Sequence, residues 1–128
     1  MTVDEWVDEY RRAWETRDPE AAAALFTTDA SYRSQIFEDP HRGTAGVTEY
    51  WTSVTEAQDD VTVRMGRPFT EGDRVAVEFW TTMQAGGSPL TLAGCLLLEF
   101  AGDGRCRHLR EYWNLHDQIV EPPDGWGA

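Results

Sequence analysis

The sequence contains no lysine, so its 11 basic residues are all arginines, and they face 23 acidic residues. The formal net charge is -12 at pH 7. A field of this sign repels phosphate backbones and anionic membrane surfaces. We therefore expect neither nucleic acid nor a membrane as a partner.

Cysteine is also scarce, with only Cys95 and Cys106. Two cysteines at this spacing are too few for a metal knuckle or a redox pair. We expect them to stay reduced, which fits a cytoplasmic location. No metal-binding spacing of histidines and carboxylates and no glycine-rich phosphate loop is present, so we expect no metal and no cofactor. The sequence shows no apolar run of about 18 residues and no charged-then-apolar start, so we expect neither a transmembrane nor a secretory segment.

Aromatic residues, by contrast, are abundant: they make up 12% of the chain, with six tryptophans in 128 residues. Large aromatic side chains line cavities as well as cores. A chain of this length fits one domain, which we place at residues 1–120. Residues 121–128 show no periodicity, and we expect either a loose or a docked tail.

The first half of the chain has helical periodicity. Apolar residues recur at helical spacing over 2–16, where Thr2 and Glu5 form a capping box. Asp18 and Pro19 predict the start of a second helix that runs to Phe26. A short strand over 29–34 and an irregular loop follow. Thr44 is the expected cap of a third helix that ends near residue 57.

The second half alternates with period two. It predicts strands over 61–70, 74–84, 89–101 and 105–115, the last two joined by a tight turn at 102–104. Three helices followed by an antiparallel meander predict an α+β domain, in which a cone-shaped curved antiparallel sheet wraps around the three N-terminal helices. Such a cone encloses a cavity.

The last strand places Glu111 on one face between Leu109 and Trp113, because residues two apart share a face. The alternate set contains Cys106, His108, Arg110, Tyr112 and Asn114. A two-residue turn at 103–104 pairs Leu96 with Glu111 and Gly94 with Trp113. We expect Gly94 to leave room for the Trp113 indole.

Several segments carry a resemblance to a known family. They are Arg17-Asp18-Pro19, residues 25–30, the turn at 40–43 and the closing Arg110-Glu111-Tyr112-Trp113. Over 2–120 the chain resembles the nuclear transport factor 2-like superfamily, and its SnoaL-like, polyketide cyclase-like branch above all. The resemblance implies the same cone-shaped fold. It leaves the function open, because that fold hosts isomerases, cyclases, dehydratases, epoxide hydrolases and non-catalytic modules.

The chain also resembles ketosteroid isomerase more distantly. The resemblance implies that Tyr10 matches the tyrosine of that family's oxyanion hole. Ser34 stands at the position of the general-base aspartate, and Leu96 at that of the protonated aspartic acid. A serine does not take a proton from carbon at neutral pH, and leucine donates no hydrogen bond. We therefore do not expect steroid isomerisation by that mechanism.

Glu111 is the candidate that remains, with three readings. As a general acid or base it would have its pKa raised by desolvation beside Leu96, Leu109 and Trp113. It could instead bind a ligand. It could also lie near the cavity mouth or pair with an arginine such as Arg33, Arg64 or Arg107, which would lower its pKa.

The predicted catalytic residues are Glu111 and Tyr10. The predicted substrate-binding residues are Trp14, Tyr32, Ser34, Trp51, Phe79, Leu96, Leu109 and Trp113. His41 has two readings, a rim histidine or a proton shuttle over the cavity mouth. His108 and His116 are expected outside the cavity.

The other face of the sheet is too apolar for full solvation. It presents Trp80, Cys95, Leu97, Tyr112, Arg110 and Glu99. We expect a homodimer through this face. The function predicted first is a cofactor-independent isomerase, cyclase or dehydratase that acts on a small apolar or polyketide-like substrate. The alternative is a non-catalytic ligand-binding or dimerisation protein of the same fold.

Overall fold

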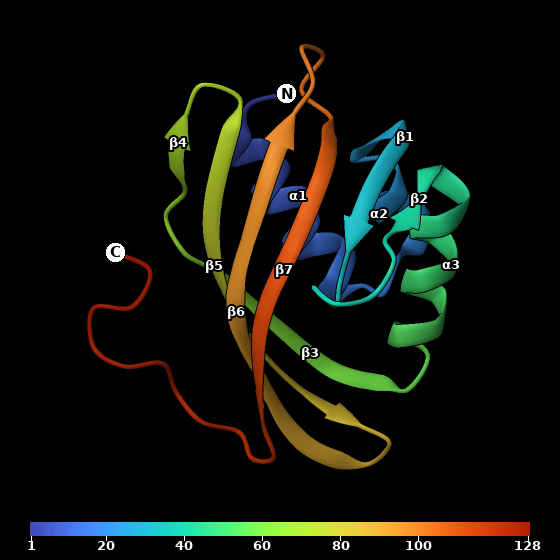
Figure 1. The fold of residues 1–128 in the computed structure, drawn as a ribbon. Helices are drawn as coiled ribbons and strands as arrows, with labels where there is room; N and C mark the ends of the chain where they lie inside the picture. Colours follow the sequence, from blue (N-terminus) through green and yellow to red (C-terminus); the bar gives the residue numbers. More distant parts are fainter.

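A computed structural model describes residues 1–128 as three helices on one side of a curved, open sheet (Figure 1). The strand order is β2-β1-β7-β6-β5-β3, and β4 pairs with β5 outside this path. The helices are α1 (Val3–Glu15), α2 (Pro19–Ala23) and α3 (Gly43–Thr55). The strands are β1 (Phe26–Arg33), β2 (His41–Arg42), β3 (Gln58–Met65), β4 (Phe69–Glu71), β5 (Arg74–Ala85), β6 (Ser88–Phe100) and β7 (Cys106–His116). The predicted α+β architecture is confirmed.

One strand pair differs from the expected antiparallel sheet. β1 and β7 run parallel, with Phe26 beside Cys106 and Tyr32 beside Leu109. Alternation along a strand predicts which face is buried but carries no information about the neighbouring strand. The first and last long strands can run in the same direction because most of the chain lies between them and supplies the crossover.

The helices form where the caps predict, with two corrections. At α1 the capping box is present: the Glu5 amide donates to the Thr2 hydroxyl, and the Thr2 amide donates to the Glu5 carboxylate. The second helix ends at Ala23 rather than Phe26, because residues from Phe26 onward pair with β7. Its cap is Asp18, whose side chain accepts from the Ala21 amide.

The third helix begins one residue before the predicted cap. Thr44 lies inside it, and the capping position is Arg42, which makes no side-chain cap bond. The reason is Gly43, whose φ of 68° turns the chain from β2 into the helix. A Cβ there would lie 2.9 Å from the Thr28 carbonyl oxygen, so only glycine fits this turn.

The strand predicted over 61–70 is two strands, β3 and β4, and both pair with β5. Pro68 lies in the gap between them and cannot donate to a strand ladder. β3 also begins earlier than predicted, at Gln58.

The β6–β7 hairpin has the predicted register, with Leu96 opposite Glu111 and Gly94 opposite Trp113. Nearer the turn the register shifts, so that Phe100 pairs with Cys106. Cys106 is therefore fully buried in the core and does not share the outer face with His108 as the alternation predicted. A β-bulge near a turn changes which residues point to each face of the sheet, and the alternation of residue types does not reveal it.

Gly94 is required for a different reason than expected. A Cβ at this position would lie 2.2 Å from the Tyr112 carbonyl oxygen and 2.8 Å from the Trp113 Cα. The Phe79 ring would be 2.9 Å away. Gly94 thus allows close approach of the β7 backbone and the Phe79 ring, rather than room for the Trp113 indole.

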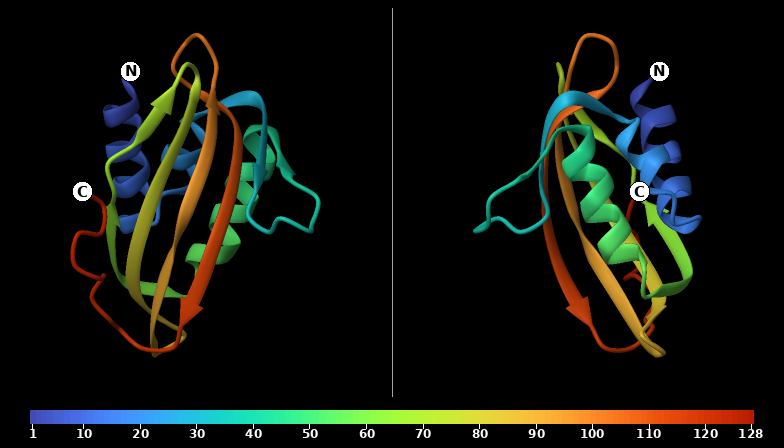
Figure 2. Two further views of the ribbon diagram at one scale, coloured as in Figure 1. Left: turned by 60° about the vertical axis from the view of Figure 1, so that its left-hand side comes forward. Right: turned by 90° about the vertical axis from the view of Figure 1, so that its right-hand side faces the viewer.

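The C-terminal tail is docked on the outer side of the sheet (Figure 2). The Trp80 indole donates to the Val120 carbonyl at 3.0 Å, and the Trp80 and Trp126 rings meet edge to face at 5.9 Å. The Arg67 amide donates to the Gly127 carbonyl. Both cysteines are free, and none of the helices has the length and apolar character needed to cross a membrane.

Candidate functional site

The helix side of the sheet contains a pocket of about 520 Å³. Its walls come from α1, β1, α3, β5, β6 and β7. Six large aromatic residues line it: Tyr10, Trp14, Tyr32, Tyr50, Trp51 and Trp113. No arginine is among the lining residues, and the carboxyl groups at the pocket are those of Glu111 and Glu38. The pocket therefore suits a neutral or cationic molecule of modest size rather than an anion.

Glu111 lies on β7 in the pocket wall and has no charged partner. The arginines considered as partners are engaged elsewhere: Arg33 bonds the Glu38 carbonyl, Arg64 pairs with Glu121, and Arg107 pairs with Asp73 and Glu99. Burial alone raises the pKa of Glu111 from its ordinary 4.5 to about 8. A pKa raised in this way favours the neutral carboxyl group near pH 7, the form that can donate a hydrogen bond.

Tyr10 and Tyr32 form a buried pair in the same pocket, with their hydroxyl oxygens 3.1 Å apart. Burial raises the pKa of both phenols well above the ordinary 10.0, and the charge of the nearby Glu111 acts in the same direction. Both tyrosines stay protonated at neutral pH. After one hydroxyl donates to the other, one phenolic hydrogen remains that can be donated to a bound oxygen.

A second polar group joins β1, β2 and β7 at the pocket. The Trp113 indole donates to the Ser34 carbonyl at 2.9 Å. The Ser34 hydroxyl lies 3.4 Å from His41 Nε2, and the His41 ring stacks on Tyr50 at 4.4 Å between centroids. Burial is the main cause that raises the pKa of Tyr50 to about 12.

Seven of the residues predicted for the site line this pocket: Tyr10, Trp14, Tyr32, Ser34, Trp51, Glu111 and Trp113. The other three do not reach it. Phe79, Leu96 and Leu109 are fully buried in the core, and the Trp14 ring covers Phe79 at 5.7 Å. The aromatic residues of α1 fill that part of the cone. The pocket therefore lies farther along the same strands, at Met83 on β5 and Leu92 on β6.

Two residues missing from the predicted site are Tyr50 and His41. Tyr50 is on the aromatic face of α3, next to Trp51, and its helical spacing was a usable signal. His41 was considered from the sequence only as a rim histidine or a proton shuttle, because its place at the pocket depends on the turn at Gly43 and the pairing of His41 with Tyr32.

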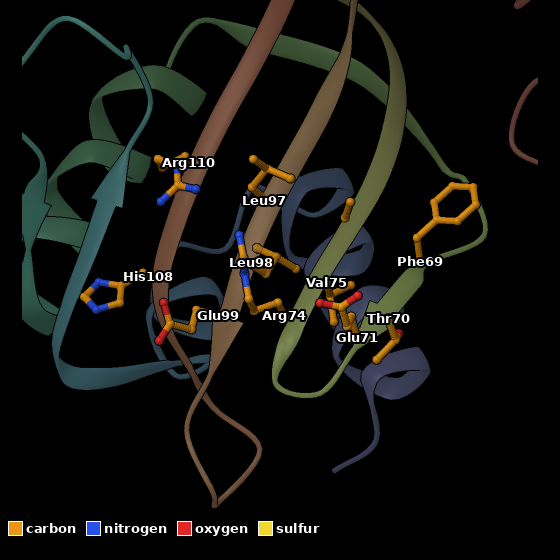
Figure 3. Close-up of a pocket in the computed structure, with 11 residues that line it drawn as sticks. Phe69, Thr70, Glu71, Arg74, Val75, Leu97, Leu98, Glu99, His108 and Arg110 are labelled. Atoms are coloured by element: carbon orange, nitrogen blue, oxygen red, sulfur yellow. The ribbon is translucent and has the colours of Figure 1, made fainter.

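The opposite side of the sheet has a second hollow of about 520 Å³, over β4, β5, β6 and β7 (Figure 3). Its lining mixes charged and apolar side chains, among them Phe69, Arg74, Leu97, His108 and Arg110. Phe69 is 65% exposed, the largest exposed fraction of any aromatic residue here except Phe37. His108 and Arg110 alternate with Leu109 and Glu111 on β7, so neighbouring residues of this strand serve the two hollows.

Comparisons with known proteins agree with this architecture. The family model described as a SnoaL-like domain matches residues 7–109. A steroid Delta-isomerase of Nocardioides simplex is 26% identical over 104 residues, which cover 81% of this chain and 83% of that protein.

Solved structures are also similar. One is a hypothetical protein with a ketosteroid isomerase-like fold from Catenulispora acidiphila, in complex with trimethylamine (TM-score 0.77, 21% identity, 87% of this chain and 86% of that one). Another is SalBIII, an epoxide hydrolase/cyclase-like enzyme of pyran ring formation in salinomycin (TM-score 0.76, 24% identity, 87% and 89%). At these identities the likeness establishes the fold.

The fold, the aromatic pocket and the matched residues define a ketosteroid isomerase-like, nuclear transport factor 2-like domain. Within that class, the chain belongs to the SnoaL-like domain family, whose members include isomerases and polyketide cyclases.

Proposed function

We propose that the protein is a cofactor-independent enzyme that moves a proton on a small neutral organic substrate, as an isomerase, cyclase or dehydratase. The observation that carries the proposal is Glu111, a carboxyl group without an ionic partner in the wall of an aromatic pocket. An unpaired, desolvated carboxyl group lowers the stability of a fold. Such groups with shifted pKa values are concentrated at functional sites.

Glu111 acts as the general acid. With its pKa raised to about 8 it holds a proton at pH 7 and can give that proton, or a hydrogen bond, to a substrate oxygen. The Tyr10–Tyr32 pair supplies a second donor for the negative charge that develops on such an oxygen. The aromatic side chains around Glu111 and the two tyrosines reduce the polarity of the surroundings, which strengthens both interactions.

The substrate class follows from the lining. Without an arginine the pocket has no partner for a carboxylate or phosphate, so a neutral carbonyl compound fits best. Polyketide-like molecules and ketones with weakly acidic C–H bonds belong to this class. The similarity to a steroid Delta-isomerase supports a substrate of this kind.

A β,γ-unsaturated ketone, cyclohex-3-en-1-one, tests the proposal. We expect the protein to accelerate its conversion to the conjugated isomer, followed by ultraviolet absorbance, and Glu111→Gln to lower the rate about 100-fold. Glu78→Gln is the matched control, because Glu78 is exposed on the outer side of β5. Equal rates for Glu111→Gln and the wild type would contradict the role of Glu111.

A second candidate function is binding without turnover, and the trimethylamine complex of the Catenulispora relative favours it. Aromatic faces attract alkylammonium ions, and an ionised Glu111 would neutralise the charge. Calorimetric titration with trimethylammonium chloride tests this candidate. Millimolar or tighter binding that weakens in Glu111→Gln, together with no conversion of the enone, would support it over catalysis.

We also propose a homodimer through the outer face of the sheet. Tyr112 on this face is 43% exposed, and Leu97 beside it is only half-buried. The docked tail covers Trp80 and so limits the free area to the part around β6 and β7. Analytical ultracentrifugation should give a dimer at micromolar concentration and a monomer for Leu97→Arg. A monomeric wild type would refute the dimer.

The proposed compartment is the cytoplasm. Cys95 and Cys106 are free thiols, and Cys106 is fully buried in the core. A reducing compartment keeps such thiols unmodified. Fractionation of cells that produce the full-length protein checks the location.

A further inference from the structure

His41 is the one imidazole at the pocket, and the fold holds its ring in place from three sides. Its backbone pairs with Tyr32 of β1, and Gly43 directs the following chain into α3. The ring stacks on Tyr50 at an interplanar angle of 27°. Nε2 lies 3.4 Å from the Ser34 hydroxyl oxygen, a long and therefore weak contact.

We propose that His41 is the proton acceptor of the pocket and works together with Glu111, which is the proton donor. This inference rests on the proposed function, since it assigns the second half of the same proton transfer. A general acid alone does not move a double bond or close a ring, because a C–H bond must also lose its proton to a base.

The hydroxyl groups that face the pocket cannot take that proton. Tyr10, Tyr32 and Tyr50 are phenols whose pKa values are raised by burial, so they remain donors. The Ser34 hydroxyl is far too weak a base. Imidazole is the side chain that most often accepts protons in enzymes near neutral pH.

Glu38 is the competing base. It lines the pocket as an exposed residue of the loop between β1 and β2, and its carbonyl accepts from Arg33. His41 is favoured over it by position, because the imidazole is half-buried and fixed by Tyr50 and Ser34, whereas an exposed carboxylate keeps its hydration. The groups around His41 are then Tyr32 on β1, Ser34 just after β1, Tyr50 on α3 and Glu38 in the loop, and Glu111 lines the same pocket.

The proposed step is balanced without a co-reactant. The C–H bond next to the substrate carbonyl breaks, its proton goes to His41 Nε2, and the electron pair moves into the carbonyl system. Glu111 gives a proton or a hydrogen bond to the resulting enolate oxygen. His41 then returns its proton to the carbon two positions along, Glu111 recovers its own, and the conjugated ketone leaves.

The test is the pH dependence of cyclohex-3-en-1-one isomerisation. The wild-type rate should fall on the alkaline side near pH 8, where Glu111 ionises. His41→Gln should lose about 100-fold in kcat. Glu111→Gln should lose the alkaline limb. Added imidazole should restore part of the rate of His41→Ala, which a purely structural role of the ring would not allow.

His116→Gln is the matched control, because His116 is exposed at the end of β7 and does not line the pocket. Unchanged thermal unfolding of His41→Gln would show that the fold is intact. A His41→Gln protein that keeps its rate overturns the inference, as does a loss of about 100-fold in Glu38→Gln. If Glu111→Gln is still impaired in those cases, the proposed function stands. No acceleration by the wild type overturns both.

Discussion

The two sides of the sheet have hollows of the same volume, about 520 Å³ each, but opposite electrostatic character. On the outer side, Glu99 lines the hollow and pairs with Arg107 at 3.4 Å, and Arg107 also pairs with Asp73 at 3.2 Å. These residues are 41–53% exposed in their side chains, so each pair contributes little. On the inner side, one carboxyl group is unpaired among aromatic rings.

The contrast arises within single strands. Along β7, Arg110 is exposed and Glu111 belongs to the inner pocket, and along β6, Leu96 is fully buried and Leu97 is half-buried. A charged side chain that is solvated on the outer side, such as Arg110, loses little hydration free energy on folding. A carboxyl group one residue farther along, on the inner side, is desolvated, and its pKa rises. Volume alone therefore does not identify a chemical site; the surroundings of its titratable groups do.

The largest expected effect tests the close contact that holds the inner wall together. In Gly94→Val the added Cβ would meet backbone atoms of Tyr112 and Trp113 that cannot move independently. We expect a loss of about 4 kcal/mol or of cooperative unfolding altogether, measured by chemical denaturation. Gly102→Ala is the control, since a Cβ there meets no atom within 4 Å. Equal stabilities would show that the hairpin relaxes freely.

The next prediction compares the inner and outer faces of β6 at the adjacent residues Leu96 and Leu97. Leu96→Ala should lower the free energy of unfolding by about 3 kcal/mol, because it leaves a cavity in the core. Leu97→Ala, on the outer side, should cost less than about 1 kcal/mol. The comparison is made on protein diluted below its association range, by urea denaturation. Similar losses at both positions would mean that the outer face is also a packed core.

A smaller effect concerns the pH dependence of stability. The pKa of Glu111 is raised from 4.5 to about 8 in the folded chain, so between these values the folded state binds more protons than the unfolded state. Its contribution to stability is complete below about pH 4.5 and is lost as the pH rises through 8. Because the carboxyl group is only partly buried, we expect about 2 kcal/mol over this window. Glu111→Gln should remove that slope in thermal denaturation between pH 5 and 9, and Glu78→Gln should retain it.

The smallest expected effect concerns the part of the outer face that the C-terminal tail covers. Trp126→Ala removes the ring that packs on Trp80 and lies 5.6 Å from the Arg64 guanidinium. We expect a loss of about 1 kcal/mol, because the contact is partly solvated. Denaturation followed by tryptophan fluorescence measures it, with Glu121→Gln as the control for the exposed ion pair to Arg64. No change would indicate that the tail binds through its backbone bonds alone.

The sequence predicted the elements whose physics is local. The capping residues located α1 and α2, alternation located the long strands, and the tight turn fixed the register of Leu96 opposite Glu111. The break at Pro68 could have been taken from the sequence, because proline cannot donate to a ladder.

The parts that could not be predicted depend on distant contacts. Parallel pairing of β1 with β7, the shift that buries Cys106 and the left-handed Gly43 all result from packing between segments far apart in sequence. For the site, the identity of Glu111 followed from strand alternation. The position of the pocket did not, because it depends on how much of the cone Trp14 fills.

The parallel pairing of β1 with β7 also has a consequence for the ribosomal synthesis of this chain. β1 ends at Arg33, but its neighbour begins only at Cys106, so the acid-bearing wall is among the last segments to emerge. Until then the aromatic stripe of α1 has no complete sheet to pack on. Contacts between residues this far apart in sequence form slowly. Until they form, the apolar surface of α1 is exposed and favours aggregation.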